Sequence, residues 1–381
     1  MRVRDLEEIR AWLVLLRAPG IGPAALRTLV ERAGSAHAAC TQSTRSKRES
    51  GLDAAALAWI ESRDEARIDA DLAWLAQPGH RLLRFNEADF PPQLAHIQQP
   101  PAALFVAGDC GLLLRAQIAV VGARAASAQG LANARAFARA FALAGLAVTS
   151  GLADGIDGAA HLGALEAGGT TIAIVGTGAD LVYPRKHREL AARIAEQGAI
   201  ASEFPPGTPA RAEHFPQRNR LIAGLALGTL VVEADLQSGS LITARLAAET
   251  GREVFALPGS IHNPLARGCH RLIRDGARLT ETAAEVVEAL APAAQALGAD
   301  LRARLDAPPD DPGELPMRGD DPDYARLLSA LDEAALDMDE LVARTGLKPA
   351  ELSSMLLLLE LEGRVAPVAS GGWQRLSRSD R

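Results

Sequence analysis

Two arginines flank an asparagine in the segment Phe215-Pro-Gln-Arg-Asn-Arg-Leu-Ile-Ala-Gly224, which starts at an aromatic residue and leads into an apolar helix. The guanidinium groups of Arg218 and Arg220 match the oxygens of a phosphate, and the face of Phe215 can stack on an unpaired base. The ligand that suits such a segment is therefore both anionic and planar.

Two glycine-bearing turns offer further anion sites. Val121-Gly-Ala-Arg124 follows a β-branched run and precedes a helix, so the Gly122 turn, the helix amides and Arg124 can together hold an anion. The turn Ser150-Gly-Leu-Ala-Asp-Gly-Ile-Asp157 is glycine-rich, which suits close approach of the backbone to a ligand or to a neighbouring strand. Asp157 can serve such a ligand or cap the helix that follows, with equal merit.

Two more polar segments complete the set. Ser238, Gly239 and Ser240 can present hydroxyls and amides to a phosphate, although Ser238 is equally suited to be a helix N-cap. Lys186 lies in the cationic run Tyr183-Pro-Arg-Lys-His-Arg188, which is either a solvated surface run or a patch that follows a nucleic-acid backbone.

The sequence lacks the motifs of cofactor binding and of catalysis. Gly176-Thr-Gly178 does not continue to the third glycine of a dinucleotide fingerprint, and no phosphate-binding loop of the Gly-x-x-x-x-Gly-Lys type is present. A Gly-x-Ser-x-Gly elbow, a His-Glu-x-x-His helix and zinc-type Cys/His spacing are also missing. We therefore expect no cofactor, no metal and no catalytic residue. Cys269-His270 is expected to pack in the fold.

Composition restricts the class of protein. The 381 residues carry a formal charge of -7, so a polyanion must be met by a local patch rather than by the whole surface. The three cysteines are odd in number and far apart, which indicates a reducing cytoplasm. No window approaches the roughly 18 apolar residues that cross a bilayer, so we expect no membrane association.

Patterning divides the chain into four parts. Residues 1–85 indicate a small domain of short helices, 86–291 an α/β domain, 292–321 a mobile Ala/Pro-rich and Asp/Pro/Gly-rich linker, and 322–381 a winged-helix-like domain. The α/β domain alternates buried β-branched runs with helical runs, which predicts a mostly parallel, doubly wound sheet of Rossmann-like type. The predicted strands are Ile118–Val121, Ala147–Ser150, Thr171–Val175, Ala199–Ser202, Thr229–Glu233 and Glu253–Leu257.

The two flanking domains each raise a question about DNA. The Gly20-Ile-Gly22 turn before Pro23 resembles a helix–hairpin–helix, but a tight corner without DNA contact is the favoured interpretation. In the C-terminal domain the expected recognition helix, Pro349–Glu362, has three glutamates and no lysine or arginine. We therefore predict that this domain contacts protein and does not hold DNA, with a two-stranded wing between Arg364 and Arg375.

Taken in order, these segments closely resemble the DprA/Smf family of DNA-processing proteins. The resemblance spans about residues 90–280. Its motifs are Phe90-Pro-Pro-Gln-Leu94, Val121-Gly-Ala-Arg124, Ser150–Asp157 with Ala160-His161, Tyr183-Pro184, Ser202-Glu203, Phe215–Gly224, Glu233-Ala234, Ser238–Ala244, Gly251–Gly259 and Leu272-Ile-Arg-Asp-Gly-Ala277.

The resemblance implies a cytoplasmic bacterial protein without enzymatic activity. Such a protein binds and protects single-stranded DNA, helps to load the RecA recombinase during natural transformation, and forms a homodimer through its Rossmann-like domain. The candidate DNA-binding residues are Gly122, Arg124, Gly151, Asp157, Lys186, Arg211, Phe215, Arg218, Asn219, Arg220, Ser238, Gly239 and Ser240. The chain departs from the family pattern at Ala123, where a serine or threonine is usual, and at Cys269-His270.

Three alternatives remain open. Arg218 and Arg220 can form ion pairs with Glu203 or Glu233. For Arg220 an ion pair and a contact with DNA are equally favoured, whereas for Arg218 a contact with DNA is favoured. The chain can also be a nucleotide-processing enzyme of the phosphoribohydrolase type, in which Glu233 faces a glycine-rich turn, although the motif Pro-Gly-Gly-x-Gly-Thr is absent. A scaffold without DNA contact fits the acidic charge but not the arginine-bearing loops.

Overall fold

The computed structural model describes residues 3–305, and beyond them 322–331, 336–347, 352, 355–356, 359, 364–367 and 372–375. The chain divides into two compact units, residues 1–306 and 307–381. No helix within the described part of the chain is long and apolar enough to span a bilayer.

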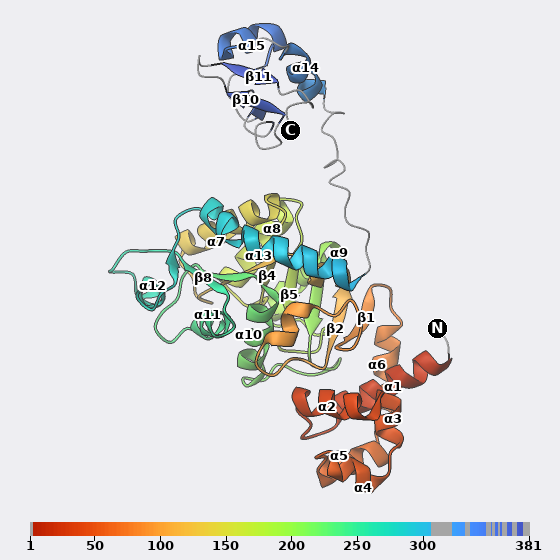
Figure 1. Ribbon diagram of the computed structural model, residues 1–381. Helices are drawn as coiled ribbons and strands as arrows, with labels where there is room; N and C mark the ends of the chain where they lie inside the picture. The colour runs from red at the N-terminus through yellow and green to blue at the C-terminus, as the bar shows by residue number, and fades with distance from the viewer. Residues whose placement is uncertain are drawn as a thin grey trace. The chain divides into compact units, whose positions relative to one another are not determined.

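A nine-stranded sheet forms the centre of the first unit, in the order β1-β2-β6-β5-β4-β3-β7-β8-β9 (Figure 1). The strands are β1 (His80–Arg84), β2 (Ala103–Gly108), β3 (Gln117–Val121), β4 (Ala147–Ser150), β5 (Thr171–Ile174), β6 (Ala199–Ser202), β7 (Gly228–Val231), β8 (Glu253–Ala256) and β9 (Arg278–Leu279). All pairings from β6 across to β9 are parallel, and only β1–β2 and β2–β6 are antiparallel. The predicted mostly parallel, doubly wound sheet is confirmed.

The six predicted strands all form, and the sheet has three more. β1 and β2 add an antiparallel edge, so residues 80–84 belong to the sheet and not to the helical domain in which residues 1–85 were placed. β9 adds a two-residue parallel strand at the other edge. β1 and β9 are edge strands with a weak pattern in the sequence, because β1 is only partly buried and both residues of β9 are exposed.

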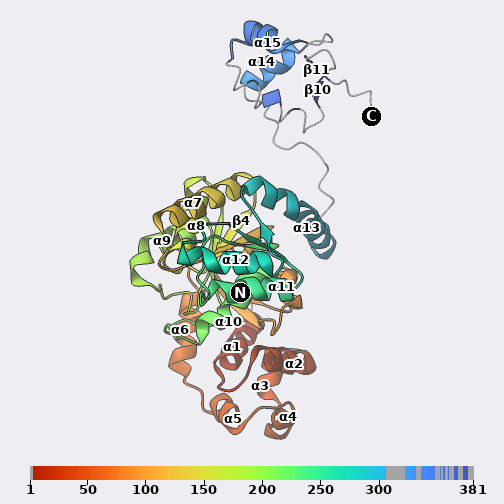
Figure 2. The same cartoon turned by 90° about the vertical axis from the view of Figure 1, so that its left-hand side faces the viewer.

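Helices cover both faces of the sheet, as the two views show (Figures 1 and 2). On β3, the side chains of Ile118 and Val120 join the core under one layer, and those of Ala119 and Val121 join the core under the other. The first layer contains α7 (Ala128–Leu143), α8 (Ile156–Glu166), α9 (Arg188–Gln197) and α13 (Ala283–Arg304); the second contains the 3₁₀ turn η1 (Pro92–His96), α10 (His214–Leu225), α11 (Ser240–Glu249) and α12 (Arg267–Arg274).

The N-terminal helices pack against the sheet through aromatic side chains. These helices are α1 (Val3–Arg17), α2 (Pro23–Ala33), α3 (Ala36–Thr41), α4 (Thr44–Glu49), α5 (Ala54–Glu61) and α6 (Glu65–Leu75). Trp74 contacts Phe105 of β2 edge to face, with ring centroids 6.1 Å apart. In the α1–α2 turn Gly20 has φ of 74°, and a Cβ at this position would lie 2.8 Å from an oxygen of Asp53. Because a carboxylate stands beside the turn, the tight corner is a better interpretation of it than a phosphate site.

Helix α13 extends into the segment predicted to be a linker. Residues 292–304 are helical and Leu297 is buried in the core under α7, so this part of the linker prediction is wrong. The helix starts at the N-cap Thr282 and tolerates Pro292 in its interior. Residues 306–321 lie outside the described residues.

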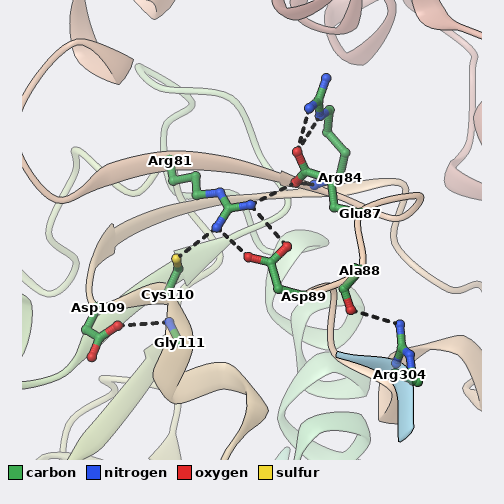
Figure 3. Close-up of polar contacts among 9 residues, drawn as sticks. All are labelled: Arg81, Arg84, Glu87, Ala88, Asp89, Asp109, Cys110, Gly111 and Arg304. Atoms are coloured by element: carbon green, nitrogen blue, oxygen red, sulfur yellow. Dashed lines mark hydrogen bonds and ion pairs between the residues drawn. The ribbon is translucent and has the colours of Figure 1, made fainter. Parts of the chain in front are cut away.

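The end of α13 is held at the connection between β1 and β2 (Figure 3). Arg304 donates hydrogen bonds to the carbonyls of Ala88 and Phe90, at 3.3 and 3.4 Å. Beside it, Arg81 of β1 pairs with both oxygens of Asp89, at 2.5 and 3.0 Å. This charged network covers an edge strand that would otherwise be open to pairing with other strands.

The second unit contains the predicted wing. β10 (Val365–Pro367) pairs antiparallel with β11 (Trp373–Arg375), after the helices α14 (Pro322–Ala330) and α15 (Met338–Thr345). In the expected recognition helix, Leu352, Met355, Leu356 and Leu359 are helical and buried. Glu351, Glu360 and Glu362, on which the protein-contact prediction depends, lie outside the described residues.

Candidate nucleic-acid interface

The candidate site lies at the point where the strand order reverses, between β3 and β7. The amide of Ala123, after β3, donates to the carbonyl of Glu233, after β7, at 2.7 Å. A Cβ on Gly122 would lie 2.8 Å from that carbonyl oxygen, so only glycine allows the two loops to pack this closely. Ligands of open α/β sheets bind beside such a reversal, at the carboxyl ends of the strands.

Arg124, Phe215 and Tyr183 lie together at this edge, where Arg124 and Tyr183 are exposed and Phe215 is partly buried. The guanidinium of Arg124 lies 5.3 Å from the centre of the Phe215 ring. The Tyr183 ring is 49% exposed and lies 5.6 Å from the Phe215 ring, with a tilt of 36°. A free cation beside two aromatic rings can bind a phosphate and stack an unpaired base at the same time. Arg124 and Phe215 were predicted from the sequence, whereas Tyr183 was not predicted as a ring partner.

Arg218 points into the protein. It is 4% exposed, and its Nη1 donates to the carbonyl of Ile174 at the end of β5. A Cβ on Gly151 would collide with the same nitrogen. Burial lowers the pKa of Arg218 to about 10; the nearby Asp157 opposes this fall and Arg124 adds to it. A direct contact with DNA, which the sequence analysis favoured for Arg218, would require the turn around Gly151 to open.

Asp157 holds the turn after β4 in place. Its Oδ2 accepts from the amides of Gly151 and Ala153, at 3.1 and 3.4 Å, and it does not cap α8. These two bonds flank Leu152, whose φ of 56° is rare for a residue with a side chain. Burial raises the pKa of Asp157, and the charge of Arg218 is the largest effect that opposes the rise. Asp157 and Arg218 therefore shape this turn from beneath.

Arg220 forms an ion pair, which was the alternative to a contact with DNA. Its Nη2 lies 2.5 Å from Oε2 of Glu203, with side chains 9% and 14% exposed. Burial raises the pKa of Glu203 even though Arg220 opposes the rise. The partner comes from the end of β6 and not from Glu233.

Glu233 occupies the helix N-terminus that was expected to bind an external anion. Its carboxylate accepts from the amide and the hydroxyl of Ser127, at 2.9 and 2.6 Å, where α7 begins. A Cβ on Gly130 would collide with this carboxylate, which shows how closely it is packed. The expectation that phosphate binds at this helix N-terminus is therefore wrong, because the protein's own carboxylate is there.

The N-terminus of α11 has no such carboxylate. Gly239 is its N-cap residue, no side chain caps it, and the hydroxyls of Ser238 and Ser240 lie 2.7 Å apart. The Nδ2 of Asn219 donates to the carbonyl of Gly239 at 3.4 Å, which brings this turn to the side of α10.

Two predicted cations lie elsewhere. Lys186 pairs with Asp154 at 2.9 Å, and His187 lies 3.2 Å from the same oxygen. The turn after β4 is thereby tied to the cationic run at 183–188. Asp154 was not predicted, because nothing in its sequence neighbourhood indicates these partners. Arg211 lies in the loop between β6 and α10, facing the N-terminal helices.

Within the described residues, no group of three or more His, Cys, Asp or Glu side chains is placed to hold a metal ion. The predicted packing of the Cys269-His270 dipeptide is confirmed for Cys269, which is fully buried, whereas His270 is only partly buried. His161 is also fully buried. Nδ1 of His161 lies 2.7 Å from the Thr171 hydroxyl, which donates to the carbonyl of Val148.

The fold and the site define a class of protein: a Rossmann-like α/β protein whose carboxyl edge presents arginine and aromatic side chains in place of a nucleotide fingerprint. Family models match the chain in three places. These are the DNA recombination-mediator protein A model at residues 81–291, a DprA-like N-terminal HHH domain at 6–62 and a DprA winged helix domain at 306–371.

Individual relatives agree with the family models. Protein Smf of Escherichia coli is 44% identical over 317 residues, 82% of each chain, and DNA processing protein DprA of Streptococcus pneumoniae is 42% identical over 225 residues, 58% of this chain and 79% of that protein. The chain belongs to the DprA/Smf family of DNA-processing, recombination-mediator proteins. The S. pneumoniae DprA structure matches with a TM-score of 0.66 and 34% identity, over 73% of this chain and 97% of that one. A structure of Helicobacter pylori DprA, a protein described as having a unique single-stranded DNA binding mode, matches with a TM-score of 0.51 and 27% identity, over 56% and 96%.

Proposed function

We propose that this protein binds single-stranded DNA along the carboxyl edge of its sheet. The observation that carries the proposal is the group formed by the exposed Arg124 and Tyr183 beside the partly buried Phe215. Arg124 supplies a cation to a phosphate, and the two rings supply faces on which bases stack without being read. The turn Ser238–Ser240 adds two hydroxyls, which lie 2.7 Å apart, at the neighbouring strand end. The single-stranded DNA binding described for H. pylori DprA supports this choice of ligand.

Arg218, Arg220 and Asp157 have a supporting role in this proposal. All three are buried, so they hold α10 and the turn after β4 in the shape that presents this group. The net charge of -7 disfavours binding over the whole surface, so a polyanion would be bound at a local patch such as this edge.

The remaining steps of the proposal rest on family membership. The protein would protect the bound strand, help to load RecA onto it during natural transformation, and do so in the cytoplasm as a homodimer. The contact between the two copies would lie on the Rossmann-like domain. The C-terminal domain would contact protein and not DNA.

The test compares the parent with Arg124→Ala and Phe215→Ala, using one single-stranded oligonucleotide and its duplex at fixed salt. Loss of a stacking ring is expected to weaken binding of the single strand by about 1–3 kcal/mol. Loss of Arg124 should also lower the slope of log affinity against log salt by about 0.7, the value for one phosphate of a single strand. The matched control is Arg139→Ala, an exposed arginine of α7 outside the strand-end loops.

The expected order is tight binding by the parent and the control, weak binding by both site variants, and weak binding of duplex by all four proteins. Equal affinity for duplex and single strand would contradict the proposed function. Unchanged affinity in Arg124→Ala and Phe215→Ala would show that the DNA lies elsewhere.

A further inference from the structure

A hollow of about 770 Å³ lies between the N-terminal helices and the strand-end loops. Helix α6 forms one wall, and the loops that follow β5 and β6 form the other. The charged residues that line it are Arg17, Arg67, Asp71, Asp180 and Arg211. Three are cationic and two are acidic, so the lining has a net charge of +1 in a chain of -7.

One ion pair fixes the two walls to each other. Nε and Nη2 of Arg17 each lie 2.6 Å from an oxygen of Asp71, which is 1% exposed. The same Nη2 donates at 2.7 Å to the carbonyl of Pro206, in the loop after β6. Arg17 and Asp71 therefore neutralise one another and join the helical domain to the loop that leads into α10.

The other two arginines are available to a ligand. Arg211 is exposed, and within the described residues its side chain makes no hydrogen bond or ion pair. Arg67 has a side chain that is 66% exposed, and its surface pair with Asp64 at 3.1 Å is one that water and salt weaken readily. The carboxylate of Asp180 accepts from the amide of Gly207, at 2.8 and 2.9 Å, which partly offsets its negative charge.

The hollow continues the line of the proposed DNA site. The carbonyl of Arg211 accepts from the amide of His214, one residue before Phe215. The strand order β7-β3-β4-β5-β6 puts four features along one edge of the sheet. In this order they are the Ser238 turn, Arg124, the Phe215 ring and the hollow. Four strand spacings of about 4.8 Å make this edge about 19 Å long, enough for several nucleotides.

We infer that the hollow is a second phosphate subsite. At this subsite Arg67 and Arg211 bind the backbone of the DNA strand beyond the nucleotides that contact Phe215. This inference rests on the proposed function, because it assigns more of the same ligand to a neighbouring place. The N-terminal domain then takes part through α6 and not through its α1–α2 turn, beside which Asp53 stands. The subsite accepts phosphates, and it reads no base.

The experiment measures affinity against oligonucleotide length for the parent, Arg67→Ala, Arg211→Ala and the double variant. A strand of about 3 nucleotides spans about 10 Å at the roughly 3.4 Å spacing of stacked bases and fits the strand-end site alone, whereas a strand of about 20 nucleotides also reaches the hollow. The double variant should bind the short strand as the parent does and the long strand about tenfold more weakly. Its salt slope on the long strand should fall by about 1.4, or 0.7 for each phosphate lost. Arg211→Lys should retain most of the affinity, because a phosphate accepts either cation.

Arg124→Ala tests the strand-end site separately from the subsite, and Arg139→Ala is the control. If Arg124→Ala weakens both lengths but the double variant weakens neither, the strand-end site stands and the subsite is wrong. If Arg124→Ala does not change the affinity at either length, DNA does not bind at the strand-end site and the proposed function is wrong there. Equal losses of affinity for short and long strands in the double variant would also contradict the subsite. They would show that these arginines contact the nucleotides that a short strand already supplies. Thermal midpoints of all variants show whether the exposed substitutions leave the fold intact.

Discussion

The pair of Arg220 and Glu203 gives the sharpest test of which arginines belong to the fold. The two side chains meet at 2.5 Å, and they are 9% and 14% exposed. Oε1 of Glu203 and Nη1 of Arg220 are buried without a hydrogen-bond partner in the described part of the chain. The pair is therefore closed to solvent but incompletely satisfied.

The magnitude follows from this geometry. In Arg220→Met, Glu203 loses its cation while it stays buried, and removal of one partner from such a pair costs about 3–5 kcal/mol of stability. Burial already raises the pKa of Glu203, so we expect this carboxyl to take up a proton in the variant. In the double variant Arg220→Met/Glu203→Leu both charges of this pair are removed, and stability should return to within about 1 kcal/mol of the parent or exceed it.

The assay combines denaturant midpoints with titrations of single-stranded DNA at one salt concentration. We expect the single variant to unfold at lower denaturant, and the double variant to bind DNA within about twofold of the parent because Arg220 is a supporting residue. A folded double variant that binds more than about tenfold more weakly would show that Arg220 contacts DNA. A single variant as stable as the parent would refute the reasoning about the buried pair.

Two further predictions concern the turn after β4 and the helix beside it. Gly151→Ala should destabilise the protein by about 1–3 kcal/mol, because the new methyl meets the buried Arg218 guanidinium; a change in unfolding free energy below about 0.5 kcal/mol would contradict this. Burial, with smaller effects of His187 and Arg218, lowers the pKa of His161 to about 3. The unfolded chain takes up this proton near pH 6.5 and the folded chain does not, so stability falls as the pH falls below that value, by about 1.4 kcal/mol per unit. His161→Gln lacks this effect, and its unfolding free energy should lose about 2 kcal/mol less than that of the parent between pH 6.5 and 5; parallel pH profiles would contradict the assignment.

Most of the sheet could be predicted because its central strands are buried on both faces. β3 and β5, for example, are continuous apolar runs bounded by helical patterns, which is typical of parallel sheets. β1 was missed because it is only partly buried, and β2 because only a short 3₁₀ turn, and no long helical run, follows it. The end of α13 was missed because an Ala/Pro-rich segment resembles a linker until the core that buries Leu297 is known.

The candidate site was predictable in its loops and less so in its side chains. Arg124 and Phe215 come together because β3 and α10 end at the same edge, as strand order in such sheets requires. Tyr183 and Asp154 gave no signal of their own, since their importance lies in what they contact. Arg218 was expected at the surface because an arginine in the first turns of a helix is usually solvated.

The sequence by itself determined the chemical types and the order of the loops: arginines, a ring and glycine turns that meet at one edge of a parallel sheet. The tertiary structure decided which of these groups face solvent. Arg218 and Arg220 lie on one short segment with Phe215, but Asp157 from the turn after β4 and Glu203 from the end of β6 supply buried negative charge near them. Whether a charge is buried depends on the segments that surround it in space, and a local pattern carries no record of those segments.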